Sequence, residues 1–138
     1  MTLVSSPRTK ILLLSEENPI ASFILDVLSS VDYEVLFSEK VILHPHFVPM
    51  ILIVNLESPF IQPDSIEKLQ QFYTDSLLIG FSSQPLNSYP VLIQNTFTVF
   101  LDIEHLKLQL MSHILKLKEV YVYKKRFKES LKKLVGHS

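Results

Sequence analysis

The chain of 138 residues contains no cysteine. This absence excludes a disulfide-stapled scaffold and a thiolate nucleophile, and it leaves no redox argument about the compartment in which the protein works. With 47% hydrophobic and 20% charged residues, the composition is that of a single compact domain with a sizeable buried core.

Long apolar runs near the N-terminus are also missing. Residues 1–9 are polar and are predicted to form a disordered segment, and the apolar run that follows is Ile11–Leu14. Four residues are too few for the core of a signal peptide and far too few to span a bilayer. We therefore predict no membrane span and a cytoplasmic protein.

Basic residues are scarce in the first three quarters of the chain. Residues 1–103 hold 4 Lys and Arg against 11 Asp and Glu, whereas residues 104–138 hold 9 against 3. The net charge of −1 therefore conceals an acidic body and a basic C-terminal segment.

Five short apolar segments alternate with segments that predict helices. We expect strands over 10–14, 33–37, 50–55, 77–81 and 97–101, a first helix capped by Asn18 with Pro19 at its first position, and a third helix capped by Asp64 or Ser65. The last helix is expected to begin near Ile103. This alternation predicts an α/β fold with a five-stranded parallel sheet, helices on both faces and right-handed crossovers.

Two connections are poor helix formers. Residues 41–48 contain Pro45 and two histidines, so the second helix is expected to be short or irregular. Residues 84–95 contain two prolines and several turn residues, so the fourth helix is expected to be degenerate.

Polar residues stand where three of the predicted strands end. The run Met50–Val54 suits a strand covered on both faces, and it ends at Asn55 with Pro59 four residues further on. The first strand ends in Ser15 and Glu16, and the fourth ends in Ser82. In open α/β sheets the working site lies beyond the carboxyl ends of the strands, so these residues define the candidate site.

The register of these strand ends resembles the receiver domain of bacterial two-component response regulators, a flavodoxin-like fold, over residues 10–118. In that family an acidic pair follows the first strand and holds Mg²⁺, and a phosphoacceptor Asp ends the third strand. Thr or Ser ends the fourth strand, and Lys-Pro follows the fifth. The resemblance places Ser15 and Glu16 at the acidic pair, Asn55 at the phosphoacceptor and Ser82 at the hydroxyl position. The fifth strand departs, because no lysine occurs between Lys68 and Lys107.

These substitutions remove the parts that phosphoryl transfer needs. An amide at Asn55 cannot attack as a carboxylate, and Mg²⁺ loses two of three carboxylate ligands. The missing lysine removes the fixed positive charge beside the phosphoryl group. We interpret the chain as a pseudo-receiver that is not an enzyme and holds no cofactor. The alternatives are a polar strand end in another flavodoxin-like family and weak divalent-metal binding by Glu16 and Glu57.

The last helical pattern continues past the domain without proline or glycine as far as Val135, and Gly136 is expected to cap it. At ~1.5 Å per residue, residues 103–134 reach about 48 Å. Residues 119–138 are therefore predicted to form a basic, amphipathic helical extension. Its predicted interaction surface comprises Val120, Tyr121, Lys124, Lys125, Arg126, Phe127, Leu131 and Leu134. A second copy of the chain, a different protein or an anionic surface could cover this extension, or it could be a solvated face.

We predict a phosphorylation-independent module for protein–protein contact and dimerisation in signal transduction. The partner is expected to be a second copy or another signalling protein. The resemblance implies contact through the last strand and last helix, the usual dimerisation face of receivers. The alternatives are binding of nucleic acid or another anionic surface by the basic helix, and a receiver still phosphorylated on an unconventional acceptor.

Overall fold

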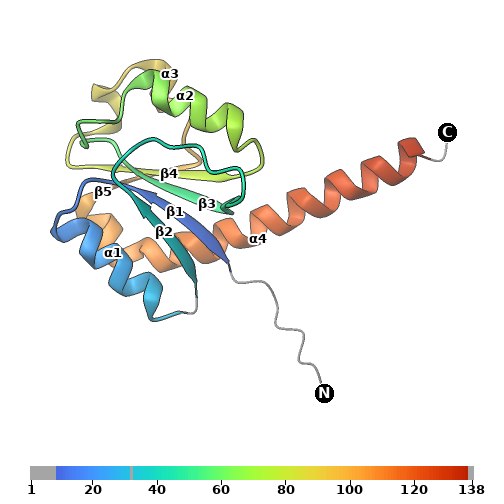
Figure 1. Cartoon of the computed structure of the whole chain (residues 1–138), viewed down its shortest axis with the longest axis horizontal. Coiled ribbons are helices and arrows are strands. Elements are labelled where there is room, and N and C mark those ends of the chain that lie inside the picture. The colour runs from blue at the N-terminus through green and yellow to red at the C-terminus, as the bar shows by residue number, and fades with distance from the viewer. Residues whose placement is uncertain (1–8, 32, 137–138) are drawn as a thin grey trace.

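The computed structural model of the chain describes residues 9–31 and 33–136 (Figure 1). The disorder predicted for residues 1–9 therefore concerns residues that lie outside this part, except for Thr9. That residue is buried, and its carbonyl accepts a 2.9 Å hydrogen bond from the backbone N–H of Glu34. The prediction was wrong for Thr9, because the pairing of the first two strands already begins at this residue.

Five strands form one parallel sheet. They are β1 (Lys10–Leu14), β2 (Glu34–Ser38), β3 (Ile51–Asn55), β4 (Leu77–Ser82) and β5 (Val99–Asp102). Their order in the sheet is β2-β1-β3-β4-β5, and every neighbouring pair is parallel. This is the doubly wound order in which the topology reverses between β1 and β3. The predicted α/β class and parallel sheet are confirmed.

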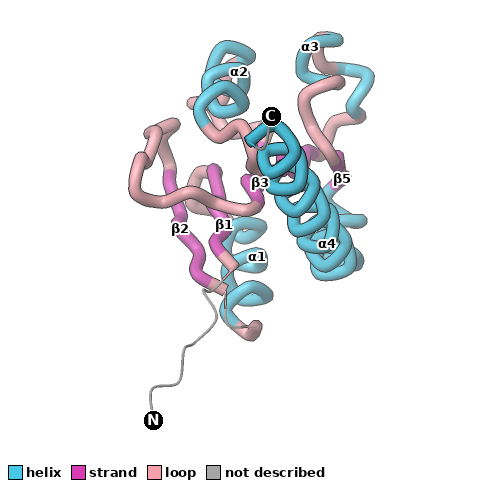
Figure 2. The backbone as a smooth tube through the Cα atoms, turned by 90° about the vertical axis from the view of Figure 1, so that its right-hand side faces the viewer, coloured by secondary structure: helices cyan, strands magenta, loops and turns pink. Residues whose placement is uncertain are grey.

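Helices cover both faces of this sheet (Figure 2). They are α1 (Pro19–Ser29), α2 (Pro63–Phe72), the 3₁₀ turn η1 (Leu86–Ser88), α3 (Val91–Gln94) and α4 (Ile103–Gly136). Buried side chains of α1 and α4 share one hydrophobic cluster, and those of α2 and α3 share the other. The sheet is therefore the middle of three layers.

The three interior strands of the sheet, β1, β3 and β4, are buried on both faces, as their apolar runs predict. Along β1, Ile11 and Leu13 join the cluster under α1 and α4, whereas Leu12 and Leu14 join the cluster under α2. This alternation follows from the two-residue period of a strand. The polar residues at the ends of these runs, Ser15, Asn55 and Ser82, lie buried at the carboxyl edge of the sheet.

No helix forms between β2 and β3, where a short or irregular one was expected. Residues 39–50 form a loop containing Pro45 and Pro49, neither of which can donate a backbone hydrogen bond. The loop is tied to α2, because the backbone N–H of His44 donates to the Tyr73 hydroxyl at 2.7 Å. The expectation of a regular βα repeat through the whole chain is therefore wrong at this crossover.

The start of α2 also differs from the prediction. Neither Asp64 nor Ser65 caps the helix, which begins at Pro63 with Gln62 in the capping position. The Ser65 hydroxyl lies inside the first turn and accepts a hydrogen bond from the backbone N–H of Gln62 at 3.4 Å. Proline is favoured at the first helical position, and this preference moves the start two to three residues toward the N-terminus.

The degenerate fourth helix is confirmed. Between β4 and β5 the chain forms only η1 and the four-residue α3, and Pro85 and Pro90 stand directly before these two turns. Each proline fixes an extended-to-helical transition and interrupts the hydrogen-bond ladder that a longer helix requires. Val91 and Leu92 of α3 are exposed, and Ile93 is its buried anchor.

The long C-terminal helix is also confirmed. Its first half buries four residues at three- and four-residue spacing, Leu106, Leu110, Ile114 and Leu117. Beyond Leu117 the helix leaves the domain and projects away from the sheet (Figure 1). The helix includes Gly136, the residue predicted to cap it, and so ends one residue later than the predicted end at Val135. Within the described residues, no helix is long and apolar enough to cross a membrane.

Candidate functional site

Asn55 lies at the carboxyl end of β3, and its side chain is almost completely buried at 5% exposure. Its amide nitrogen donates to the hydroxyl of Ser15, at the end of the neighbouring strand β1, over 3.2 Å. Its amide oxygen accepts from the backbone N–H of Glu57 over 3.0 Å. Both polar atoms of the side chain are therefore used to join two strand ends and a turn.

Ser15 and Ser58 continue this network across the sheet edge. The Ser15 hydroxyl donates to the backbone carbonyl of Glu16 at 2.8 Å, and the backbone N–H of Glu16 donates to the Ser58 hydroxyl at 3.0 Å. Ser15 and Ser58 are both buried. These short side chains tie the β1 loop to the turn after β3, so the loop backbone is bonded to protein groups at these points.

Ser82, at the end of β4, forms its hydrogen bonds within its own connection. Its hydroxyl lies 2.5 Å from the hydroxyl of Tyr89 and accepts from the backbone N–H of Gln84 over 2.9 Å. The Tyr89 ring in turn packs against Phe100 of β5, with ring centroids 6.4 Å apart. Ser82 therefore holds the short connection between β4 and α3 against the sheet.

Glu57 connects the turn after β3 to the loop after β4. Its two carboxylate oxygens accept hydrogen bonds from Ser83, one from the backbone N–H at 2.5 Å and one from the hydroxyl at 2.7 Å. These donors, backbone first, hold the pKa of Glu57 below its ordinary value, and Ser82 adds a smaller effect in the same direction. An ionised carboxylate thus clamps the two loops together.

Asp102 ends β5, the strand after which the receiver family carries lysine. Its carboxylate accepts from the backbone N–H of His105 at 2.8 Å and contacts Nδ1 of the His105 ring at 2.6 Å. These two bonds lower the pKa of Asp102. A carboxylate that accepts from the first turn of a helix acts as an N-terminal cap, so Asp102 starts α4 directly from the strand.

The structure brings two of the four predicted site residues together, Asn55 and Ser15. Ser82 lies at the adjacent strand end, one residue beyond the Phe81 that pairs with Asn55, and bonds elsewhere. The Glu16 side chain is exposed. The sequence interpretation missed Ser58, Ser83 and Tyr89. Ser58 and Ser83 follow the polar strand ends Asn55 and Ser82 within three residues, and this position is the available signal, because serine often hydrogen-bonds nearby backbone groups in turns.

Metal binding has little support at this edge. Among the described residues, no group of three or more His, Asp or Glu side chains is arranged to hold a metal ion. Of the two weak candidates, Glu57 is bonded through both oxygens to Ser83, and Glu16 is a single carboxylate. The hydrogen bonds of Glu57 to Ser83 would compete with coordination of Mg²⁺ by the same oxygens.

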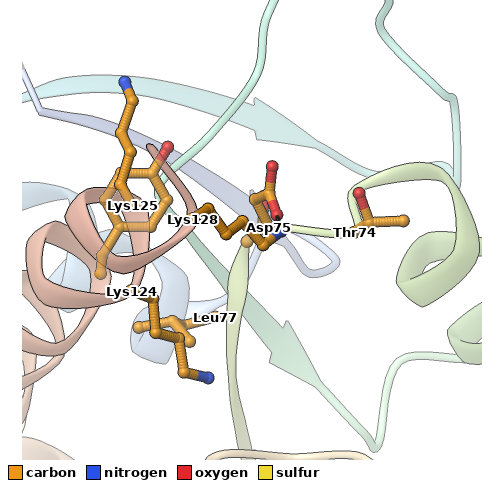
Figure 3. Close-up of a pocket in the computed structure, with 8 residues that line it drawn as sticks. Thr74, Asp75, Leu77, Lys124, Lys125 and Lys128 are labelled. Carbon is orange, nitrogen blue, oxygen red and sulfur yellow. Dashed lines mark hydrogen bonds and ion pairs between the residues drawn. The ribbon is translucent and has the colours of Figure 1, made fainter. Parts of the chain in front are cut away.

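A second region of interest is the junction between the domain and the projecting part of α4 (Figure 3). A cavity of about 390 Å³ lies there, lined on the domain side by residues 74–77 and on the helix side by Tyr121, Lys124, Lys125 and Lys128. Lys128 forms an ion pair with Asp75. The amines of Lys124 and Lys125 point away from Asp75 in opposite directions. Four residues of α4 thus line the space between the helix and the domain.

The predicted interaction surface on α4 is divided by this junction. Its apolar members Val120, Phe127, Leu131 and Leu134 are exposed, whereas Tyr121 is half-buried beside the domain. Lys124 and Lys125 line the cavity, and Arg126 lies on a different side of the helix in a shallow groove with Leu115 and Val122. The predicted interaction surface therefore comprises residues that face in different directions around the helix.

No protein-family model matches the chain, and no curated protein matches it in sequence. Solved structures do match. The signal receiver domain of an HD domain-containing protein from Pseudomonas fluorescens Pf-5 is similar at a TM-score of 0.78 and 16% identity, with 91% of this chain and 97% of that chain covered. The signal receiver domain of a Luxo repressor protein from Vibrio parahaemolyticus is similar at 0.64 and 17% identity, with 85% and 98% covered. The chain has the receiver fold.

A third similar structure carries a trimeric coiled-coil segment, amino acids 181–211 of yeast Spc42, fused to another structure. Its TM-score is 0.71 at 13% identity, and the match covers 97% of this chain and 98% of that chain. Residues 1–118 make up only 118 of the 138 residues. A match of this extent therefore includes α4 beyond the point where it leaves the domain.

Proposed function

We propose that the chain is a degenerate receiver, a signalling module that acts through contact with other proteins and without phosphorylation. The observation that carries this proposal is the state of Asn55. It stands at the strand end that presents the reactive acid in the receiver family, and both its polar atoms are occupied by Ser15 and the Glu57 backbone. An amide in this position offers no anionic nucleophile, and burial restricts access of a phosphodonor.

The charges around Asn55 support the same conclusion. Phosphoryl transfer requires cations that neutralise the transferring group. Here Glu57 bonds the loop after β4 and Asp102 ends β5, so the edge of the sheet presents anions at these two positions. Neither carboxylate supplies the neutralising cation that the transfer requires, and like charges repel an incoming phosphodonor. We infer no catalytic activity and no resident cofactor.

The contact surface that we propose is α4. The domain proper comprises residues 10–118, and residues 119–138 form a basic extension whose described part continues the same helix. An amphipathic helix that leaves its domain exposes apolar side chains that a partner can cover. The similarity of the chain to a structure that carries a fused coiled-coil segment supports this role. The partner is a second copy of the chain or another signalling protein.

The test of the phosphorylation-independent mechanism uses acetyl phosphate and Mg²⁺ with the full chain, read by intact-protein mass. We expect no phosphorylated species, whereas an active receiver domain treated in parallel gains one phosphate. The Asn55→Asp variant is also expected to stay unmodified, because Ser15 supplies no carboxylate ligand for Mg²⁺ and no lysine stands after β5. Phosphorylation of the unaltered chain would refute the proposal.

The basic side chains of the extension favour one competing function, binding of nucleic acid. Lys132 and Lys133 are exposed near the end of α4, and Lys124 and Lys125 reach solvent at the junction. Phosphate contacts release counterions, so such binding must weaken steeply with salt. A fluorescence anisotropy titration with duplex DNA at low salt decides the matter, and a salt-sensitive affinity would establish this function instead.

A further inference from the structure

Beyond Leu117 the surface of α4 has two sides with different chemistry. The side toward the domain carries Tyr121 and Lys128 and is partly covered by residues 74–77, whereas Lys124 lies at its edge with its amine pointing away from Asp75. A partner helix cannot lie along this side, because the domain already occupies the space. Any partner must approach α4 from a direction in which the helix is free over its whole projecting length.

One line of apolar side chains meets this condition. Val120, Phe127 and Leu134 recur at intervals of seven residues, and Tyr123 follows Val120 by three. Their exposed fractions are 39%, 57%, 73% and 73% respectively. We call these four residues the distal seam. A seven-residue apolar repeat is the pattern of the a positions of a coiled-coil helix, here Val120, Phe127 and Leu134, and the two d positions hold Tyr123 and the polar Ser130.

The distal seam differs from the interaction surface that the sequence predicts, because it includes Tyr123 and leaves out Tyr121, Lys124, Lys125, Arg126 and Leu131. In the structure Tyr121, Lys124 and Lys125 line the cavity beside the domain, so the open apolar line lies on another side of the helix. Lys124 and Leu131 then take e positions, which flank a coiled-coil core, and Glu119 and Arg126 take g positions.

We propose that the distal seam pairs, in parallel and in register, with the distal seam of a second copy of the chain. This inference rests on the proposed function of α4 as the contact surface. In a parallel pair a g residue lies next to the e residue five positions later in the other helix. Glu119 therefore lies next to Lys124 of the second copy, and this opposite-charge pair forms twice by symmetry. An antiparallel pair instead places g positions against g positions and loses both.

Charge also explains why the pairing is specific. Between residues 118 and 134 the helix carries seven Lys and Arg against two Glu. Most of these cations, including Lys125, Lys128 and Lys132, lie away from the distal seam and stay outside the interface when two seams meet. A seam of one side chain in width suits a helix, whereas a helix that lies in a lipid surface presents a broader apolar face.

The domain lowers the free energy cost of forming this pair. An isolated segment of two heptads is too short to be a stable helix, because the first turn is costly to nucleate. Here the extension grows from the half of α4 that is already fixed against the sheet by Leu106, Leu110 and Leu117. Two heptads still bury little surface, so the pair is expected to be weak and to depend on protein concentration.

Disulfide cross-linking tests the orientation directly, because the native chain has no cysteine. Single variants Val120→Cys and Leu134→Cys of the full chain are oxidised separately. Both are expected to form covalent dimers, since each position faces itself only in a parallel, in-register pair. Lys125→Cys, on the side toward the domain, is the matched control and is expected to stay monomeric. Cross-linking only when Val120→Cys and Leu134→Cys are mixed would show an antiparallel pair and overturn the proposal.

Sedimentation velocity over a range of concentrations tests the seam without a covalent bond. Phe127→Lys is expected to abolish the dimer, whereas Leu108→Lys, at an 83% exposed position outside the seam, should leave it unchanged. Both variants change exposed side chains, and circular dichroism checks that they fold. A native chain that stays monomeric at every concentration, or that instead binds phosphatidylserine vesicles, would refute the second copy as partner. Neither outcome affects the acetyl phosphate test, which examines Asn55 alone.

Discussion

The amide nitrogen of Asn55 donates to the hydroxyl of Ser15 over 3.2 Å, across the pair of strands at which the sheet reverses its winding. In a receiver that uses phosphate, carboxylates at these two positions would hold a metal ion between them. Two neutral side chains instead bond to each other. This bond joins the ends of β1 and β3 directly.

Removing this bond should therefore destabilise the fold and not only alter a site. Asn55→Ala removes the acceptor of the Glu57 backbone N–H and the donor to the buried Ser15 hydroxyl, at a cost of about 1–3 kcal/mol in the free energy of unfolding. Asn55→Asp should also destabilise, because it buries a charge with no cation nearby. Urea unfolding measures both, and a variant as stable as the native chain would contradict the network described here.

The bond between Glu57 and Ser83 makes stability depend on pH. The pKa of Glu57 is lower in the folded than in the unfolded chain, so its contribution is full above the ordinary glutamate pKa of about 4.3 and is lost as pH falls through the lowered value. Glu57→Gln should reduce this acid-side loss and cost roughly 0.5–1 kcal/mol at neutral pH, since the carboxylate is exposed to solvent. Thermal unfolding between pH 3 and pH 7 measures the change.

The exposed Glu17, for which the structure shows no such clamp, provides the control for that experiment. Glu17→Gln should leave the pH profile close to that of the native chain. Ser83→Ala removes the hydroxyl donor but keeps the backbone donor, so its profile should lie between those of the native chain and Glu57→Gln. An unchanged profile in Glu57→Gln would show that the clamp does not stabilise the fold.

Gly80 in β4 is required by a close approach. A Cβ atom at this position would lie 2.9 Å from the ring of Phe97, closer than side chains pack. Gly80→Ala should therefore lower the free energy of unfolding by about 1–3 kcal/mol, because the ring or the strand must move. In a Phe97→Leu background the same substitution should cost less, since the smaller side chain leaves room for the methyl group. Equal costs in the two backgrounds would contradict this packing.

The start of α4 depends on Asp102. Asp102→Ala removes the acceptor for the backbone N–H of His105 and should lower the melting temperature, whereas Asp102→Asn keeps an acceptor oxygen and should lower it less. The variant Asp102→Lys, which restores the residue type found in the receiver family after the fifth strand, should also lose the cap. Differential scanning calorimetry of the three variants tests this order, and Asp102→Ala as stable as Asp102→Asn would contradict it.

Much of the fold could be predicted from local pattern. The unbroken apolar runs in β1, β3 and β4 indicate strands buried on both faces, and the stripe from Leu106 to Leu117 indicates a helix packed on the sheet. Pro85 and Pro90 explain in advance why the fourth helix is reduced to two short turns, η1 and α3. These predictions succeed because backbone period and proline geometry act within a few residues.

The candidate site was predictable only in part. The strand register places Ser15, Asn55 and Ser82 at one edge, because parallel strands end together. Their partners could not be predicted. Ser58, Ser83 and Tyr89 act through loops whose paths depend on contacts between segments far apart in the chain, with Glu57 and Ser83 separated by 26 residues and Glu16 and Ser58 by 42. Hydrogen bonds of this kind leave no periodic trace in a sequence.

The sequence by itself determined that this protein is a parallel α/β domain with an amide at the end of its third strand and a long basic helix at its end. The tertiary structure decided which atoms that amide bonds, that a loop and not a helix joins β2 to β3, and which side of α4 remains open. The physical reason is distance along the chain. Propensity and hydrophobic period act between near neighbours, whereas polar partners and exposed faces are settled when distant segments pack together.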